Sequence, residues 1–169
     1  HLQGAGHRVI FLLGGFTAIV GDPTGKSETR QFITPEQVRA NGEAMRAQVQ
    51  RLGLLDFERA DAPAVMQNNY DWLDMKLSEY MLNAARYFSV NRLLTHETYQ
   101  ERLNKQEHLS LMEFLYSTLQ GYDYLHLYQA EGCRLQIGGN DQWRNILDGV
   151  ELIQYVLGKQ AYALTFPLL

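Results

Sequence analysis

Three polar side chains at helical spacing are the first candidates for chemistry in this chain. Tyr116, Gln120 and Asp123 occupy positions i, i+4 and i+7 of a segment with a helical pattern. That spacing places a phenol, an amide and a carboxylate on one face of a helix, where all three can reach one small ligand. A solvated polar stripe has the same spacing, so the spacing alone leaves both interpretations open.

A glycine turn ahead of a polar helix start is the second candidate. The apolar run 135–137 leads into Gly138 and Gly139, and then into Asn140, Asp141 and Gln142. Two glycines allow a ligand to approach the backbone closely, and a polar helix start suits an anionic or polar group. A plain turn with an Asx cap is the alternative. Together the two candidates predict a pocket for a small zwitterion and a nucleotide-like group.

A charged loop near the N-terminus is the third candidate. Residues 21–27 resemble a phosphate-binding loop, but one residue fewer separates the glycines than a Walker A loop requires. We interpret Asp22 instead as a carboxylate at the carboxyl end of a strand, where open α/β sheets bind ligands. Lys26 and Arg30 could then reach phosphates as mobile charges. A polar loop without a ligand is the alternative.

The remaining sequence predicts strands that alternate with helices, which is typical of an α/β fold with a parallel sheet. Strands are expected at 9–13, 64–66, 135–137 and from 166 onward. Helices are expected at 34–52, 76–87, 97–104, 141–157 and from Ser110 through Gln120. A loop of small residues should follow the first strand. We interpret residues 34–104 as a mostly helical insertion in one partial nucleotide-binding catalytic domain that spans residues 1–169.

Composition narrows the function classes. The chain has 169 residues, a length typical of one domain, and its net charge of −4 is not that of a general electrostatic nucleic-acid binder. The single cysteine, Cys133, rules out an internal disulfide and suits a reducing compartment. Since no apolar run approaches the length of a membrane span, we expect a cytoplasmic or organellar-matrix protein. No histidines or cysteines pair at metal-ligand spacing, so no metal site is expected. Both ends look cut, which suggests a piece of a longer protein.

Several motifs, in order along nearly the whole chain, resemble the catalytic domain of bacterial-type tyrosyl-tRNA synthetases, which are class I aminoacyl-tRNA synthetases. The strongest match is the segment from Leu135 to Trp143. The resemblance implies a Rossmann-like parallel sheet, present here in part, with a helical insertion. The other matching segments are residues 5–8, 21–26, 68–72, 88–92 and 119–123.

The resemblance implies that one group of residues binds the substrate tyrosine: Asp22, Tyr116, Gln120, Asp123, Gln136 and Gln142. The first three would hold the ammonium group. Asp123 would accept a hydrogen bond from the phenol hydroxyl, and Gln142 would contact the tyrosine carboxylate or carbonyl. Gln136 would line the same pocket.

The resemblance also implies where ATP binds. Gly139 and Asp141 would hold the ribose of the adenylate, while Lys26 and Arg30 would lie near the pyrophosphate. ATP would enter as a substrate with Mg²⁺, and no tightly bound cofactor is implied. No residue here is assigned a catalytic role, because the tyrosine carboxylate is already an ionised nucleophile and catalysis rests on positioning and electrostatics.

The implied activity is that of a tyrosine–tRNA ligase, whose partners are L-tyrosine, ATP, tRNA(Tyr) and a second copy that forms a homodimer through residues 76–104. The ATP-binding His-x-Gly-His signature is expected upstream of His1 and a lysine-rich loop downstream of Leu169, so the fragment alone should be inactive. Arg144 departs from the family, which usually has glycine there. A non-catalytic RNA-binding or structural paralogue and a tryptophan-specific relative are the alternatives.

Overall fold

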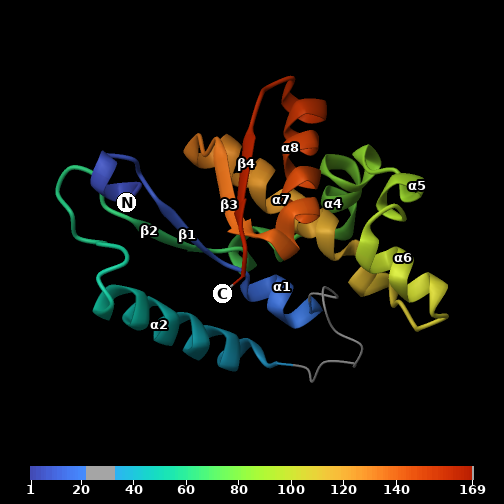
Figure 1. Cartoon of the computed structure of the whole chain (residues 1–169), viewed down its shortest axis with the longest axis horizontal. Helices are drawn as coiled ribbons and strands as arrows, with labels where there is room; N and C mark the ends of the chain where they lie inside the picture. The colour runs from blue at the N-terminus through green and yellow to red at the C-terminus, as the bar shows by residue number, and fades with distance from the viewer. Residues whose placement is uncertain (22–32, 169) are drawn as a thin grey trace. The chain divides into compact units, whose positions relative to one another are not determined.

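The computed structural model describes residues 1–21 and 33–168, and these residues form two compact units. The first unit contains the described residues of His1–Ile19 and Gln31–Leu73, and the second contains those of Val20–Arg30 and Asp74–Leu169. Each unit holds one pair of parallel strands together with helices (Figure 1). None of the described helices is both long enough and apolar enough to cross a membrane.

Two parallel strands form the sheet of the first unit. They are β1 (Ile10–Leu13) and β2 (Val65–Asn68), and Ile10 pairs with Val65. The other elements of this unit are η1 (Gln3–Ala5), α1 (Gly15–Val20), α2 (Pro35–Arg51) and α3 (Tyr70–Leu73). Parallel strands need a crossover connection, and the chain between β1 and β2 contains α1 and α2. The predicted parallel pairing of these two strands is confirmed.

Helix α2 begins and ends within one residue of the prediction. The side chain of Thr34 accepts a hydrogen bond from the N–H of Gln37 at 3.3 Å, and the side chain of Gln37 accepts one from the N–H of Thr34 at 3.0 Å. This capping box satisfies two backbone donors at the helix start. Gly53, just past the end, has φ = 63°, a left-handed conformation that glycine adopts at low cost.

Helix α1 replaces the loop that the sequence predicted after β1, so that prediction was wrong. Its first turn is held by Asn69, a buried residue at the end of β2. The side-chain oxygen of Asn69 accepts a hydrogen bond from the N–H of Phe16 at 2.8 Å, and its amide donates to the hydroxyl of Thr17 at 3.1 Å. Because this support comes from a residue distant in sequence, the local pattern gave no sign of it.

The second unit is mostly helical and carries the second strand pair. Its strands β3 (Leu135–Gly139) and β4 (Tyr162–Phe166) run in parallel beside helix α8 (Figure 1). Its helices are α4 (Leu77–Asn83), η2 (Ala85–Tyr87), α5 (Val90–Leu93), α6 (Glu97–Asn104), α7 (Leu111–Glu131), η3 (Asn140–Gln142) and α8 (Trp143–Leu157). The predicted strand from residue 166 onward was wrong, because β4 begins at Tyr162 and ends at Phe166, just before Pro167.

Helices α7 and α8 cross in close contact and form the core of this unit. The crossing point is at Gly121 and Gly149: a Cβ at position 149 would lie 2.9 Å from the Cβ of Tyr124 and 3.3 Å from the carbonyl oxygen of Gly121. Only residues without a side chain allow two helix backbones to come this close. The buried core around the crossing consists of Tyr80, Ala84, Tyr124, Leu125, Leu152, Ile153 and Ala161.

Tyr124 joins α7 to the start of β4, and we expect its replacement by phenylalanine to lower stability. The side chain is 1% exposed, and its hydroxyl donates to the carbonyl of Tyr162 at 2.8 Å and accepts from the N–H of Tyr162 at 3.2 Å. Loss of the hydroxyl should cost about 1–2 kcal/mol of unfolding free energy. Urea unfolding at pH 7 measures this, and Tyr155→Phe, at an exposed site on α8, is the matched control.

The same substitution should reduce the sensitivity of the fold to alkali. Burial raises the pKa of the Tyr124 phenol in the folded protein. Its contribution to stability is therefore fully present below the unfolded pKa of about 10 and is lost as pH rises toward the folded value, because the unfolded chain releases the proton first. Tyr124→Phe should lose less stability than the wild type between pH 9 and 11, and an equal loss would show that other groups control the alkaline transition.

Candidate functional site

The three polar residues of α7 do not form a solvated stripe. Asp123 is 2% exposed, and Tyr116 and Gln120 are half-buried. Because a buried carboxylate is costly unless it is paired, solvation does not explain its position. Helix α7 also continues to Glu131, so Asp123 lies in mid-helix and not at a helix end beyond Gly121, as the sequence suggested.

His126 follows Asp123 one turn later on α7, and burial lowers the pKa of its imidazole, against a smaller opposite effect of Glu131. The imidazole is therefore neutral near pH 7.

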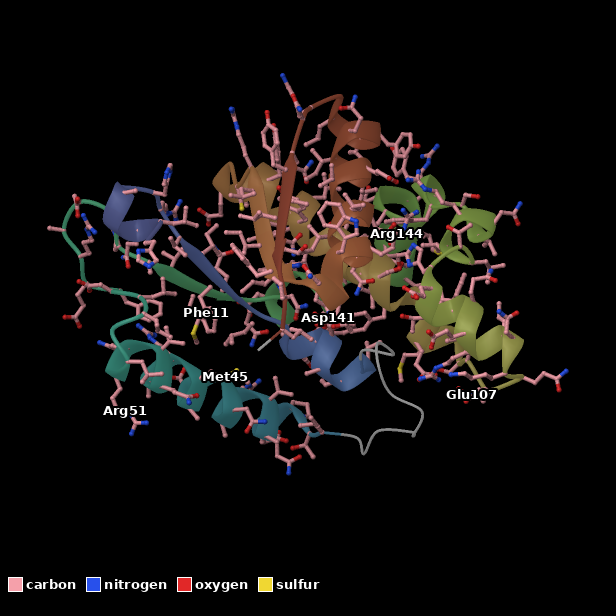
Figure 2. All side chains as sticks on the ribbon, viewed as in Figure 1. Phe11, Met45, Arg51, Glu107, Asp141 and Arg144 are labelled. Carbon is pink, nitrogen blue, oxygen red and sulfur yellow. The ribbon has the colours of Figure 1, made fainter. Side chains whose placement is uncertain are left out.

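A chain of hydrogen bonds connects α7 to the turn after β3. The amide of Asn145 donates to the side-chain oxygen of Gln120 at 3.2 Å and to that of Gln142 at 3.1 Å. The amide of Gln142 in turn donates to a carboxylate oxygen of Asp141 at 2.9 Å. The structure thus brings three of the predicted residues, Gln120, Gln142 and Asp141, into one network. Asp141 lies in η3, just before α8 (Figure 2).

Gly139 fixes the position of the Asp141 carboxylate. A Cβ at position 139 would lie 2.4 Å from Oδ1 of Asp141 and 2.7 Å from a methyl carbon of Leu168. Any side chain there would displace the carboxylate. The Asx cap of the alternative interpretation is not observed, because neither η3 nor α8 has a side-chain cap hydrogen bond at its start. The polar side chains of the turn are therefore not used for capping.

Gln136 contributes a buried acceptor to β3. Its Oε1 is buried and has no hydrogen-bond partner among residues 1–21 and 33–168. Such an atom costs free energy unless a donor reaches it. A ligand with a hydroxyl or ammonium donor would meet that need, as the sequence prediction for Gln136 requires.

Asp22, Lys26 and Arg30 lie outside the described residues, as does most of the loop that resembles a phosphate-binding loop. In the part of the chain that the structure does describe, no group of three or more His, Cys, Asp or Glu residues is placed to hold a metal ion.

Asn145 is the residue that the sequence reasoning missed. It is buried on α8, one turn after Gln142, and its amide donates hydrogen bonds to both Gln120 and Gln142. The available signal was weak: a short amide among the apolar residues of the predicted helix 141–157. Its role depends on the contact between α7 and α8, which local patterns do not reveal.

These features define an α/β domain of the class I synthetase kind, in which a polar helix face and a glycine turn meet beside parallel strands. The family model described as tRNA synthetases class I (W and Y) matches residues 1–169, and the chain belongs to this family. The predicted fold class is therefore confirmed.

Relatives with curated descriptions include several tyrosine–tRNA ligases. Those of Desulfatibacillum aliphaticivorans and Syntrophus aciditrophicus are each 48% identical to the chain over 170 aligned residues, which include all of this chain and 38% of the relative. The chain thus spans less than half the length of these relatives.

Two solved structures have the same fold. The C-terminally truncated mitochondrial tyrosyl-tRNA synthetase of Aspergillus nidulans matches with a TM-score of 0.86 and 28% identity, over 98% of this chain and 52% of that one. The corresponding protein of Coccidioides posadasii matches with a TM-score of 0.81 and 29% identity, over 98% and 51%.

Proposed function

We propose that this chain is part of a tyrosine–tRNA ligase, which activates L-tyrosine with ATP and transfers it to tRNA(Tyr). The observation that carries the proposal is the hydrogen-bonded network of Gln120, Asn145, Gln142 and Asp141. It links the helix face suited to an amino acid with the turn suited to a nucleotide. The names of the relatives support tyrosine over tryptophan as the substrate.

In this proposal, α7 and β3 bind the amino acid. Tyr116 and Gln120 take the ammonium group together with Asp22, which lies outside the described residues. Asp123 accepts the hydrogen bond of the phenol hydroxyl, and it lies buried on the same helix as Tyr116 and Gln120. Gln136 lines the same pocket with its unpaired buried oxygen.

The turn after β3 takes the nucleotide end. Gln142 contacts the tyrosine carboxylate, while Gly139 and Asp141 hold the ribose of the adenylate. Lys26 and Arg30, outside the described residues, act near the pyrophosphate. ATP enters as its magnesium complex, so Mg²⁺ belongs to the substrate.

The chemistry needs no general base. The tyrosine carboxylate attacks the α-phosphorus of ATP, the bond to the β-phosphate oxygen breaks, and pyrophosphate leaves. A hydroxyl of the terminal tRNA ribose then attacks the carbonyl carbon of the adenylate, the bond from that carbon to the phosphate oxygen breaks, and AMP leaves with the hydroxyl proton on its phosphate. The protein contributes mainly by holding the two reacting groups in line and by stabilising charge.

Tyrosine-dependent ATP–pyrophosphate exchange and tRNA charging by the complete protein test this function. We expect exchange with tyrosine and none with tryptophan or phenylalanine. Exchange with tryptophan would favour the tryptophan-specific alternative. RNA binding without exchange for any amino acid would favour the non-catalytic paralogue.

We also propose a homodimer and cytoplasmic or organellar residence. Exposed apolar side chains on the helices of the second unit support the dimer; they are Leu77, Met81, Leu82, Val90 and Leu111. An exposed apolar surface of this kind is typical of protein interfaces. Sedimentation of the complete protein tests the dimer.

Replacing Asn145 with alanine should weaken tyrosine binding although Asn145 has no assigned contact with the substrate. The change removes two hydrogen bonds that position Gln120 and Gln142, so we expect KM for tyrosine in the exchange reaction to rise about tenfold. Gln154→Ala, at an exposed position on the same helix, is the control. A tyrosine KM equal to that of the control would show that the two glutamines hold their places without Asn145.

A further inference from the structure

A cavity of about 70 Å³ lies between helix α8 and the segment 87–93, which contains α5. Three aromatic side chains, two carboxylates, an arginine and a serine are among the residues that line it. None of the described residues assigned to tyrosine or ATP lines it, and neither does any of the exposed apolar residues that support the dimer. The volume is enough for about two water molecules or one small polar group.

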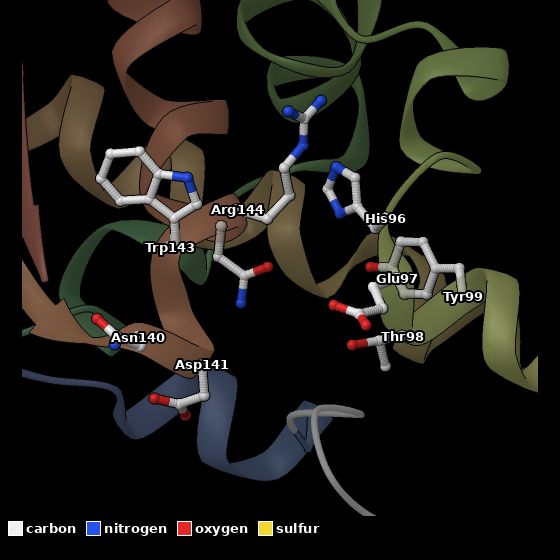
Figure 3. Close-up of a pocket in the computed structure, with 9 residues that line it drawn as sticks. His96, Glu97, Thr98, Tyr99, Asn140, Asp141, Trp143 and Arg144 are labelled. Carbon is white, nitrogen blue, oxygen red and sulfur yellow. The ribbon is translucent and has the colours of Figure 1, made fainter. Parts of the chain in front are cut away.

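Asp148 is the buried charge of this cavity. Its side chain is 3% exposed, and its Oδ2 forms no hydrogen bond within the described part of the chain. The Nε2 atom of His96 lies 3.4 Å from this oxygen but forms no hydrogen bond either, and a protonated imidazole is the alternative partner. His96 and Arg144 line a separate cavity, between the starts of α6 and α8 (Figure 3). A ligand that donates to Oδ2 would remove the cost of an unpaired buried carboxylate.

The other charges that line the cavity cancel. Arg92 donates to the carboxylate of Glu151, and its guanidinium lies 3.5 Å from the hydroxyl oxygen of Tyr155. This pair is neutral as a whole, so Asp148 gives the lining a net negative charge. A small cavity with that charge favours a cation over an anion.

Ser89 adds a hydroxyl that the neighbouring helix does not use. It occupies the N-cap position of α5, where serine commonly caps, yet its side chain makes no cap hydrogen bond. Tyr87, Phe88 and Tyr155 line the same cavity, and aromatic rings attract cations. The guanidinium of Arg86 already lies 5.6 Å from the ring centroid of Tyr87, so the other two rings are the more available surfaces.

We propose that this cavity binds a primary alkylammonium group, whose N–H donors meet Oδ2 of Asp148 and the hydroxyl of Ser89. An ammonium group has three donors and no acceptor, which matches a lining with a carboxylate and a free hydroxyl. The first carbons of the alkyl chain would contact Leu93 and Leu152, which also line the cavity and which a metal ion would leave unused. A free alkylamine and a lysine side chain share this chemistry.

The cavity adjoins the crossing of α7 and α8. A Cβ at Gly121 would lie 3.3 Å from Cζ of Phe88 and 3.4 Å from the backbone carbonyl carbon of Asp148. Two residues that line the cavity thus pack against the crossing, which places Asn145 within reach of Gln120. A bound ammonium group should therefore stabilise the fold around the crossing. This inference goes beyond the proposed function and does not depend on it.

The test follows the melting temperature of the complete protein as n-butylammonium chloride is added, with sodium chloride at equal ionic strength as the reference. A ligand this small should bind with a Kd of about 1–10 mM. Ten times that concentration should raise the melting temperature by about 2–4 °C relative to sodium chloride. n-Butanol, which lacks the charge, should give no such rise. N-acetyl-lysine amide is the second probe, and the tighter of the two amines identifies the source of the group.

Three variants assign the effect to this cavity. Asp148→Asn keeps the size of the side chain and should abolish the rise. Its melting temperature without amine should equal or exceed that of the wild type, because it removes an unpaired buried charge. Ser89→Ala should raise Kd about two- to tenfold, as expected for one lost hydrogen bond. Asp74→Asn, at an exposed position, is the matched control and should behave as the wild type does.

A melting temperature of Asp148→Asn well below that of the wild type without amine would overturn the inference, because it would show that a protonated His96 already pairs with Asp148. An equal rise with amine in the wild type and in Asp148→Asn would overturn it too. So would a wild type that responds no more to butylammonium than to sodium, since water would then fill the cavity. None of these outcomes depends on tyrosine-dependent exchange, so a failure of the proposed function remains distinguishable.

Discussion

Replacing Asp123 with alanine in the complete protein should lower kcat/KM for tyrosine by about 10- to 100-fold, the loss expected for a charged hydrogen bond in a buried site. Asp123 is almost fully buried on α7 and has a neutral histidine one turn away. A phenol hydroxyl that donates to this carboxylate forms a charged hydrogen bond away from solvent. Steady-state ATP–pyrophosphate exchange as a function of tyrosine concentration measures the effect.

The discrimination against phenylalanine separates this role from a general loss of stability. Phenylalanine has no hydroxyl to donate to this carboxylate, so the wild type should reject it strongly. Asp123→Ala removes that penalty, and the ratio of kcat/KM for tyrosine to that for phenylalanine should fall. Asp123→Asn keeps the size and an acceptor oxygen, so its loss should be smaller. Asp74→Ala, at an exposed position, is the control. Unchanged tyrosine affinity in both Asp123 variants would remove this residue from the site.

Replacing Gly149 with valine should destabilise the protein by up to about 3 kcal/mol, because extra atoms enter a closely packed core. The first added carbon would lie 2.9 Å from the Cβ of Tyr124, which is buried and next to the backbone and so has little room to move. Valine favours a helix more than glycine does, but by well under about 1 kcal/mol, so the clash dominates. Urea unfolding measures the change.

The same variant should also impair tyrosine binding, because the α7–α8 crossing places Asn145 within reach of Gln120. Ala130→Val introduces the same side chain at an exposed position near the end of α7 and should leave both stability and KM close to the wild type. A stable Gly149→Val protein with a normal tyrosine KM would show that the two helices can separate without disturbing the site.

The parts of the fold that depend on neighbours in sequence were predictable. The capping boxes at Thr34 and Ser110 define the starts of α2 and α7, since each needs only residues three apart. The parallel pairing and the glycine turn after β3 also followed from local patterns. The residues on one face of α7 were predictable for the same reason, because helical periodicity fixes which side chains are neighbours.

The features that depend on contacts between distant segments were not predictable. Helix α1 is held by Asn69 from the end of β2, and Asn145 acquires its role only where α7 and α8 cross. The extent of β4 was not predictable because its residues alternate between exposed and half-buried. Such a strand lacks the continuous apolar run that marks a fully buried strand in a sequence. Pro167 lacks the N–H that a central strand position requires, which is consistent with the end of β4 at Phe166.

The hydrogen-bonded network of the site has a direction, and that direction begins at Asp141. A carboxylate only accepts, so Gln142 must turn its NH₂ group toward Asp141 and its oxygen toward Asn145. Asn145 must then present its NH₂ group to both glutamines, which leaves Gln120 oriented with its oxygen inward. A second lone pair on that oxygen is what an ammonium group requires. The carboxylate of Asp141, which is assigned to the nucleotide, therefore sets which atom Gln120 on α7 presents to the amino acid. An asparagine in place of Asp141 would leave the orientations of the Gln142, Asn145 and Gln120 amides undetermined.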